Sequence, residues 1–215
     1  MIKNIIFDMD GVLVDSEAAI RAASIKMFGR RGLAVEAEDF IPFTGMGETR
    51  FIGGVAEKYG MDFTPDMKAE AYAIYGEIAG EHVVVFDGVG ELIPELRRRG
   101  YKLAVASAAD DVKVRVNLRC LGLTYDDFDA VVTGSDVTKF KPDPQCFLMA
   151  CEKLGGIPGE SLVVEDAVAG CRAAKAAGMI CAGVTSTFGA DELLAAGADY
   201  TVEKTPEILG VVICT

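Results

Sequence analysis

The sequence predicts an α/β protein, a doubly wound parallel sheet with a small all-helical domain inserted after its first strand. Three observations lead to this prediction. Residues 2–7 are almost continuously apolar, as expected of a strand buried on both faces of a parallel sheet. Residues 16–81 show helical patterns without convincing strands. From residue 83 onward, short apolar runs alternate with helical patterns, which is typical of a doubly wound sheet.

The inserted segment contains three helical patterns. Residues 16–32 and residues 48–60 each place apolar side chains on one helical face, and each pattern ends in a glycine. The third pattern begins at Thr64, a residue type that often caps helices, with Pro65 in the first helical position. Because these helices are flanked by sheet-forming segments on both sides, they are expected to form a domain of their own.

The sequence therefore predicts two domains. Residues 1–15 and 84–215 are expected to form the α/β core, and residues 16–83 the helical domain. Within the core, strands and helices are expected to alternate along the chain. The expected strands after the first are 101–107, 129–133, 161–166, 179–185 and 199–202, and the expected helices are 88–100, 110–122, 143–155, 167–178 and 189–197.

The composition argues against several classes of partner and chemistry. The chain has 215 residues and a net charge of −12. Nucleic acids and anionic membrane surfaces bind clustered Lys and Arg, so neither is expected as a partner. No run approaches the roughly 20 apolar residues of a membrane span. The single histidine, His82, is too little for a zinc site or for Ser-His catalysis, so acid–base chemistry must depend mainly on carboxylates.

The cysteines and the N-terminal residues predict a cytoplasmic protein. The 6 cysteines form no C-x-x-C pair and lie mostly in apolar or helical settings, which favours reduced, buried thiols. The opening MIKNIIFDMD places acids within the first ten residues and lacks the apolar region and cleavage site of a signal peptide. A monomer or a weak homodimer is expected.

Polar side chains gather where three of the expected strands end. In an open parallel sheet, ligands bind outside the carboxyl ends of the strands, near the topological switch point. Four carboxylates at one edge repel each other, because each pair about 4 Å apart costs roughly 4 kcal/mol at an effective dielectric of 20. A bound cation would relieve this cost, and oxygen ligands favour Mg²⁺. The residues of this group are Asp8, Asp10, Ser107, Lys141, Glu165 and Asp166.

Four segments of the chain, FDMDG, VASAA, KPDP and VVEDAVAG, resemble the four motifs of the haloacid dehalogenase (HAD) superfamily. Their order and flanks are most similar to the beta-phosphoglucomutase-like branch, which carries a small helical cap of the C1 type after the first strand. The resemblance covers essentially the whole chain. It implies a Rossmann-like core and a Mg²⁺-dependent phosphatase whose substrate is a small phosphorylated metabolite, with a sugar phosphate as one candidate.

The resemblance also implies a role for each motif residue. Asp8 would be the nucleophile that forms an aspartyl-phosphate. Asp10 would be the general acid for the leaving alkoxide and then the general base for water. In both steps Asp10 would carry the proton for part of the time. Lys141 would bridge the phosphoryl group and Asp8. Mg²⁺ would be bound by Asp8, the main-chain carbonyl of Asp10 and Asp166, with Glu165 as a further ligand or a supporting group.

Substrate contacts are implied for two further segments. Ser107 and the backbone amide of Ala108 would hold phosphoryl oxygens, although Ser107 as an ordinary helix cap is an open alternative. The loop that starts the second helical pattern would read the substrate, although an ordinary turn explains its glycines equally well. The candidate residues in and after this loop are Gly45, Met46, Gly47, Glu48 and Arg50.

Two alternatives to a phosphatase remain open. A beta-phosphoglucomutase must bind a second phosphate and therefore needs a cation in the cap. Glu48 occupies the place where the resemblance implies an arginine, which favours hydrolysis, although Arg50 could substitute. A non-catalytic interaction domain is disfavoured because every acid that the chemistry needs is present.

Overall fold

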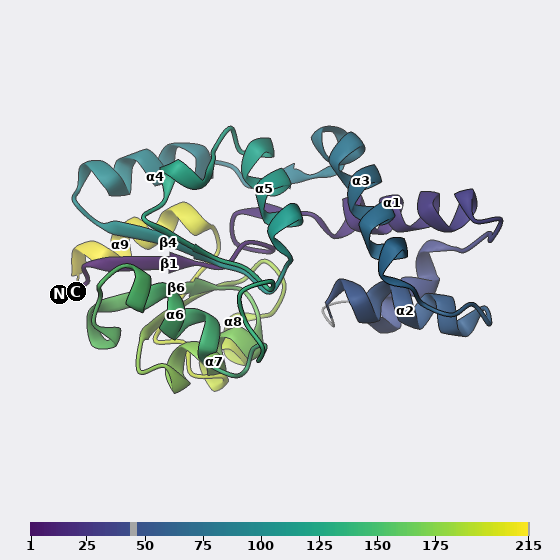
Figure 1. Ribbon diagram of the computed structural model, residues 1–215. Coiled ribbons are helices and arrows are strands. Elements are labelled where there is room, and N and C mark those ends of the chain that lie inside the picture. Colours follow the sequence, from purple (N-terminus) through teal and green to yellow (C-terminus); the bar gives the residue numbers. More distant parts are fainter. Residues whose placement is uncertain (44–46, 215) are drawn as a thin grey trace. The chain divides into compact units, whose positions relative to one another are not determined.

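A computed structural model describes residues 1–43 and 47–214 of the chain, which divides into two compact units (Figure 1). The first unit comprises Met1–Asp15 and Val85–Thr215, and the second comprises Ser16–Val84. The segments where the chain passes from one unit to the other pair as a small two-stranded sheet, formed by β2 (Val14–Asp15) and β3 (Val84–Val85).

The first unit is built on a six-stranded parallel sheet with the order β5-β4-β1-β6-β7-β8. Strand β1 lies inside the sheet, and the chain continues to β4 on one side of it and to β6 on the other. This reversal of strand order makes the ends of β1, β4 and β6 the topological switch point. The predicted fold class is confirmed. The strand bounds are β1 (Asn4–Phe7), β4 (Lys102–Ala106), β5 (Ala130–Val132), β6 (Ser161–Glu165), β7 (Ile180–Val184) and β8 (Tyr200–Val202).

Helices cover both faces of this sheet. Figure 1 shows α6, α7 and α8 on one face and α4 and α9 on the other. On the α6–α8 face, buried side chains of these helices pack with those of the strands into one apolar core. The bounds are α4 (Val89–Arg98), α5 (Asp111–Cys120), α6 (Gln145–Lys153), α7 (Val168–Ala176), α8 (Ala190–Ala195) and α9 (Ile208–Cys214), with 3₁₀ turns at Tyr125–Asp127, Pro158–Glu160 and Thr205–Glu207.

Helix α9 is absent from the elements predicted from the sequence. It has 7 residues, too few to be stable in isolation, so its pattern carries little local signal. Tertiary contacts stabilise it instead. Ile208 and Val212 are buried, and the hydroxyl of Tyr101 donates a hydrogen bond of 3.3 Å to the carbonyl of Val212. Just before the helix, the hydroxyl of Thr205 donates to the carbonyl of Val12 at 2.6 Å.

The second unit is helical. Its largest packing contact lies between α1 and α3, and three aromatic rings, Phe28, Phe40 and Phe51, stack in a row with centroid separations of 6.3 and 4.8 Å. The three helical patterns predicted from the sequence are all present, and a 3₁₀ helix precedes the second of them. The bounds are α1 (Glu17–Arg30), η1 (Ala37–Phe43), α2 (Glu48–Lys58) and α3 (Pro65–His82).

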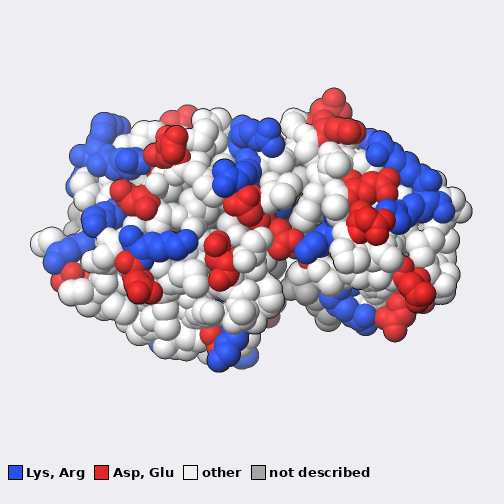
Figure 2. Space-filling view, in the orientation of Figure 1, with Lys and Arg blue, Asp and Glu red and all other residues white. Residues whose placement is uncertain are grey.

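The surface carries charges of both signs. Figure 2 shows Lys and Arg side chains interspersed with Asp and Glu side chains over the face drawn. The 5 cysteines whose side chains are described carry free thiols, and 4 of them are buried. Within the described part of the chain, no helix combines the length and the apolar composition that crossing a membrane requires.

Candidate active site

The chain turns sharply where β1 ends, and this turn presents Asp8 and Asp10 at the carboxyl edge of the sheet. The backbone N–H of Asp8 still donates to the Val164 carbonyl of β6, at 2.9 Å. Gly11 then adopts a φ of +79°, which favours glycine. A Cβ at Gly11 would also lie 1.9 Å from Oδ2 of Asp166, so any larger residue would displace that carboxylate. The glycine of FDMDG therefore lets the β1 turn approach the end of β6.

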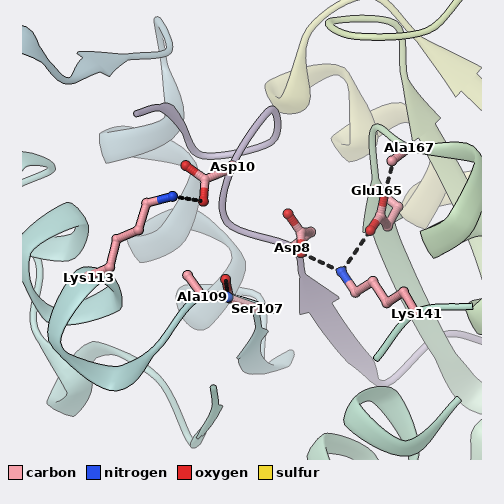
Figure 3. A network of polar contacts seen from close by, with 8 residues as sticks. All are labelled: Asp8, Asp10, Ser107, Ala109, Lys113, Lys141, Glu165 and Ala167. Carbon is pink, nitrogen blue, oxygen red and sulfur yellow. Dashed lines mark hydrogen bonds and ion pairs between the residues drawn. The ribbon is translucent and has the colours of Figure 1, made fainter. Parts of the chain in front are cut away.

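Three buried carboxylates meet beside this turn. Asp8, Glu165 and Asp166 each offer one oxygen, and these oxygens lie within 4.8 Å of one another. The ammonium of Lys141, from the segment before α6, donates to Asp8 and also to Glu165 at 2.7 Å (Figure 3). The second oxygen of Glu165 accepts from the backbone N–H of Ala167 at 2.6 Å. Residues from three distant segments thus form one charged cluster.

The charges of this cluster oppose each other. Burial and repulsion from Glu165 raise the pKa of Asp8 to about 7, although Lys141 acts in the opposite direction. Burial, with repulsion from Glu165 and Asp8, raises the pKa of Asp166 to about 8. Burial alone would lower the pKa of Lys141, but attraction from Asp8 and Glu165 outweighs it and raises that pKa. The single ammonium of Lys141 therefore neutralises only part of the negative charge of the three carboxylates.

These residues fit a divalent cation of the Mg²⁺ type. The donors are carboxylate oxygens, which hard cations prefer, and they already lie close enough to share one ion. Burial raises the pKa values of Asp8 and Asp166, and repulsion from the neighbouring acids adds to this rise, so a positive charge would be favoured beside these acids. A cation bound here would relieve the repulsion that the sequence predicts for these acids.

The carboxylate of Asp10 lies outside this cluster. Figure 3 shows it directed toward Lys113 of α5, whose Nζ donates to Oδ2 of Asp10 at 3.1 Å. The sequence predicts other acids as the neighbours of Asp10, and the structure adds a cation that contacts its carboxylate. Sequence reasoning missed Lys113, because a lysine within a helical pattern reads as solvent-exposed, whereas its side chain is only 4% exposed.

Ser107 directly follows β4 and lies buried at the same edge of the sheet. Its Oγ accepts a hydrogen bond of 3.1 Å from the backbone N–H of Ala109, so the side chain closes a turn. The N-cap of α5 is Asp110, so the structure does not support the alternative that Ser107 is an ordinary helix cap. Ala108 is exposed. Its carbonyl oxygen lies so close to Gly134 that a Cβ added to this glycine would be only 2.2 Å from it.

Comparison with protein families decides which family these motifs represent. A family model described as a haloacid dehalogenase-like hydrolase matches residues 2–178. The chain belongs to this family. The resemblance of the four motifs to the HAD superfamily is confirmed, and so is the Rossmann-like fold that it implies.

Individual relatives of this HAD-like hydrolase agree with that assignment. It is 42% identical over 191 residues to the protein SUPPRESSOR OF QUENCHING 1, chloroplastic, of Arabidopsis thaliana, and this match covers 87% of the chain but only 18% of that relative. It is 31% identical over 210 residues to validoxylamine A 7'-phosphate phosphatase of Streptomyces hygroscopicus subsp. limoneus, covering 97% of the chain and 96% of the relative.

A solved structure from Thermotoga maritima, assigned as a beta-phosphoglucomutase, superposes on the HAD-like hydrolase with a TM-score of 0.81 and 29% identity, and the match covers 100% of both chains. This likeness agrees with the resemblance to the beta-phosphoglucomutase-like branch. Together, the relatives and this structure support a phosphoric monoester hydrolase, with a phosphomutase as the alternative.

The predicted substrate-reading residues lie in the helical unit of the HAD-like hydrolase. Gly45 and Met46 fall outside the described residues, and Gly47 is the exposed residue before α2. Glu48 begins α2. Arg50 donates to Glu57 at 2.9 Å, and its guanidinium carbon lies 5.1 Å from the ring centroid of Phe43. The charge of Arg50 therefore has an anionic partner within its own helix.

A loop after β7 adds contacts to the site of the HAD-like hydrolase that sequence reasoning missed. The hydroxyl of Ser186 donates to the carbonyl of Gly11, which fixes the turn after β1. A hydrogen bond from Thr187 acts to lower the pKa of Asp166, against the effects of burial and of the neighbouring acids. The available signal was the TST sequence directly after an apolar strand, at the edge where the other site residues lie.

Close packing in α7 provides a test of how Glu165 is held. A Cβ at Gly170 would lie 1.8 Å from Oε1 of Glu165, whose two oxygens are bound by Lys141 and Ala167. We expect Gly170→Ala to lower the free energy of unfolding by about 1–3 kcal/mol, the usual cost of overpacking. It should also reduce turnover, because Glu165 can move only by breaking these contacts. Urea denaturation and activity assays measure the two effects.

Gly90→Ala in α4 is the matched control, because a Cβ at that helical glycine meets nothing within 4 Å. This control should be unchanged or stabilised by up to about 1 kcal/mol. Equal stability and activity of the two variants would show that Glu165 is not held as described.

Proposed function

We propose that this protein is a Mg²⁺-dependent phosphatase that hydrolyses a small phosphorylated metabolite through an aspartyl-phosphate on Asp8. The observation that carries the proposal is the buried carboxylate of Asp8, bound by Lys141 and surrounded by Glu165 and Asp166 at the switch point of the sheet. The relative from Streptomyces is named as a phosphatase of validoxylamine A 7'-phosphate, which supports a phosphate ester as the substrate.

Four residues of the chain, in addition to Asp8, would have defined roles in the reaction. The Asp8 carboxylate attacks phosphorus while the bond from phosphorus to the leaving oxygen breaks. Asp10 gives its proton to that oxygen, and later takes a proton from the water that attacks the aspartyl-phosphate. Lys141 lies between Asp8 and Glu165 and offsets the charge of the phosphoryl group. Ser107 and the amide of Ala108 would hold phosphoryl oxygens.

Mg²⁺ would be held by Asp8, Asp166 and the main-chain carbonyl of Asp10, with Glu165 as a further ligand or a supporting group. When bound, the ion would neutralise part of the phosphate charge and so allow an anionic carboxylate to approach an anionic phosphate. The buried carboxylate oxygens within 4.8 Å of one another support this assignment.

Metal removal gives a direct prediction. We expect a chelator to abolish turnover and Mg²⁺ to restore it. We also expect Mg²⁺ at about 100 times its dissociation constant to stabilise the protein by about 2.7 kcal/mol, as any ligand of the native state would. Thermal unfolding of metal-free protein, with and without added Mg²⁺, measures the second effect without an assay of activity.

Asp166→Asn tests where the ion binds. Above pH 8, where the Asp166 carboxylate is ionised, metal-free Asp166→Asn should be at least as stable as the wild type, because one of three repelling charges is gone. Its unfolding midpoint should hardly respond to Mg²⁺. Asp199→Asn, which alters an ion pair with Lys175 at the amino end of β8, should respond like the wild type. A full Mg²⁺ response of Asp166→Asn would exclude this site.

We further propose that residues 16–83 act as a cap that selects the substrate, and that the protein works in the cytoplasm as a monomer or weak homodimer. A helical unit inserted directly after the catalytic turn supports the first point. The free thiols support a reducing compartment.

The activity is tested by incubating the protein and Mg²⁺ with a panel of phosphorylated metabolites and measuring released phosphate. Turnover of at least one ester supports a phosphatase. No turnover on the panel, nor on a chromogenic ester, would favour a non-catalytic domain. Conversion of beta-glucose 1-phosphate with a bisphosphate primer into glucose 6-phosphate would instead establish the mutase, against which Glu48 and the pairing of Arg50 with Glu57 argue.

A further inference from the structure

Lys113 lies in a position that is unfavourable for a lysine. It is the third residue after the N-cap Asp110, in the first turn of α5, where the helix dipole disfavours positive charge. Its side chain is only 4% exposed, and burial of an ammonium is costly unless an anion compensates for it. Neither helix formation nor core packing explains a lysine here, so the explanation lies with the group that Lys113 contacts.

Lys113 contacts Asp10, the proton carrier of the proposed reaction. The Asp10 side chain is 26% exposed, and its Oδ2 lies 3.1 Å from the ammonium of Lys113. Figure 3 shows the carboxylate of Asp10 directed toward Lys113, while the carboxylate of Asp8 faces Lys141. The site thus holds two separate acid–lysine pairs, and each lysine comes from a different segment of the chain.

We propose that Lys113 is a positioning residue that holds the Asp10 carboxylate in place for its exchange of protons with the leaving oxygen and with water. This inference rests on the proposed phosphatase function. Lys113 gains and loses no proton in the reaction. In this role it acts through Asp10, so its removal should affect only the steps in which Asp10 takes part.

Lys113→Met removes the ammonium and keeps most of the length of the side chain. On an alkyl phosphate, whose leaving oxygen needs a proton, we expect the rate of aspartyl-phosphate formation, measured in a single turnover, to fall by about 10- to 100-fold, part of the 10²- to 10⁴-fold that general acid catalysis supplies. On p-nitrophenyl phosphate, whose leaving group needs no proton, the rate of this first step should fall less than about threefold, and KM should change little on either ester. Lys113→Arg should recover most of the loss.

Two further variants separate this role from a structural one. Lys175→Met removes another lysine that pairs with an aspartate, at a distance of 2.7 Å from Asp199, and should leave both esters unaffected. Asp10→Ala combined with Lys113→Met should be no slower than Asp10→Ala alone, because Lys113 acts only through Asp10. Losses in the rate of aspartyl-phosphate formation that multiply in the double variant, or that are equal on the two esters, would overturn the proposal.

A crystal structure of Lys113→Met provides a test that does not depend on turnover. We expect the Asp10 carboxylate to occupy another rotamer or several rotamers, whereas an unchanged position would overturn the proposal. If Lys113→Met fails to fold, Lys113→Gln is crystallised in its place with the same two outcomes. If the wild-type protein hydrolyses no ester, the phosphatase function fails, and the crystal structure still decides whether Lys113 positions Asp10.

Discussion

Replacing Asp8 with Asn is expected to lower turnover by roughly four orders of magnitude or more. Only the residual rate that substrate binding and electrostatic stabilisation supply would remain. An amide is not a nucleophile, so no bond to phosphorus can form. The substitution preserves the shape of the side chain and an oxygen that can accept from Lys141, so the fold should be unchanged. Phosphate release measures the rate, and circular dichroism checks the fold.

Trapping of the intermediate makes this test specific. Wild-type protein quenched in acid during turnover should carry the added mass of one phosphoryl group on the peptide that contains Asp8. Asp8→Asn should carry none. Asp199→Asn is the control, since Asp199 lies at the amino end of β8 and accepts from Cys181 at 2.8 Å, far along the strands from the catalytic turn. Wild-type rates for Asp8→Asn, or a phosphorylated peptide elsewhere, would contradict the role of Asp8 as nucleophile.

Among the substitutions proposed for this protein, Lys141→Met is expected to lower the free energy of unfolding most. It should also lower activity. The lysine is 10% exposed and compensates for two buried carboxylates, Asp8 and Glu165. Its removal leaves those charges unpaired, and breaking a buried pair in this way typically costs about 3–5 kcal/mol. Turnover should fall by about 100-fold or more, since a preorganised cation near the transferred group is lost. Urea denaturation at pH 8 measures the first effect and phosphate release the second.

Lys175→Met is the comparison for stability, because its pair with Asp199 is 38% exposed on both sides. Exposed pairs of this kind contribute at most about 1 kcal/mol. Mg²⁺ should restore part of the stability lost in Lys141→Met, because a divalent ion can offset the same carboxylates. If Lys141→Met is no less stable than Lys175→Met, Lys141 cannot be the main counter-charge of the cluster.

The parts of the fold that could be predicted are those with a local cause. The apolar runs at 5–7 and 162–164 are buried inside the parallel sheet, and all ten elements expected after the helical segment are present with bounds shifted by a few residues. Helix α9 could not be predicted, because its 7 residues depend on Tyr101 and on the buried contacts of Ile208. The 3₁₀ helix Ala37–Phe43 likewise lacked a local pattern.

The same division applies to the candidate site. Asp8, Glu165 and Asp166 could be grouped from the sequence, because the carboxyl ends of parallel strands meet at one edge. Lys113 could not, since its position in a helical pattern says nothing about which way its side chain turns. Ser186 and Thr187 directly follow an apolar strand, so a signal for them was present but was overlooked. Asp10 shows the consequence most clearly, because its expected neighbours were acids and its actual partner is a lysine.

Sequence by itself determined the alternation of strands and helices, the insertion of a helical unit and the set of acids available for chemistry, because periodicity and residue type are properties of short segments. Only the tertiary structure decided how those acids are paired. Lys141 with Asp8 and Glu165, and Lys113 with Asp10, are contacts between residues 24 to 133 positions apart, and such pairings depend on how strands and loops pack in three dimensions.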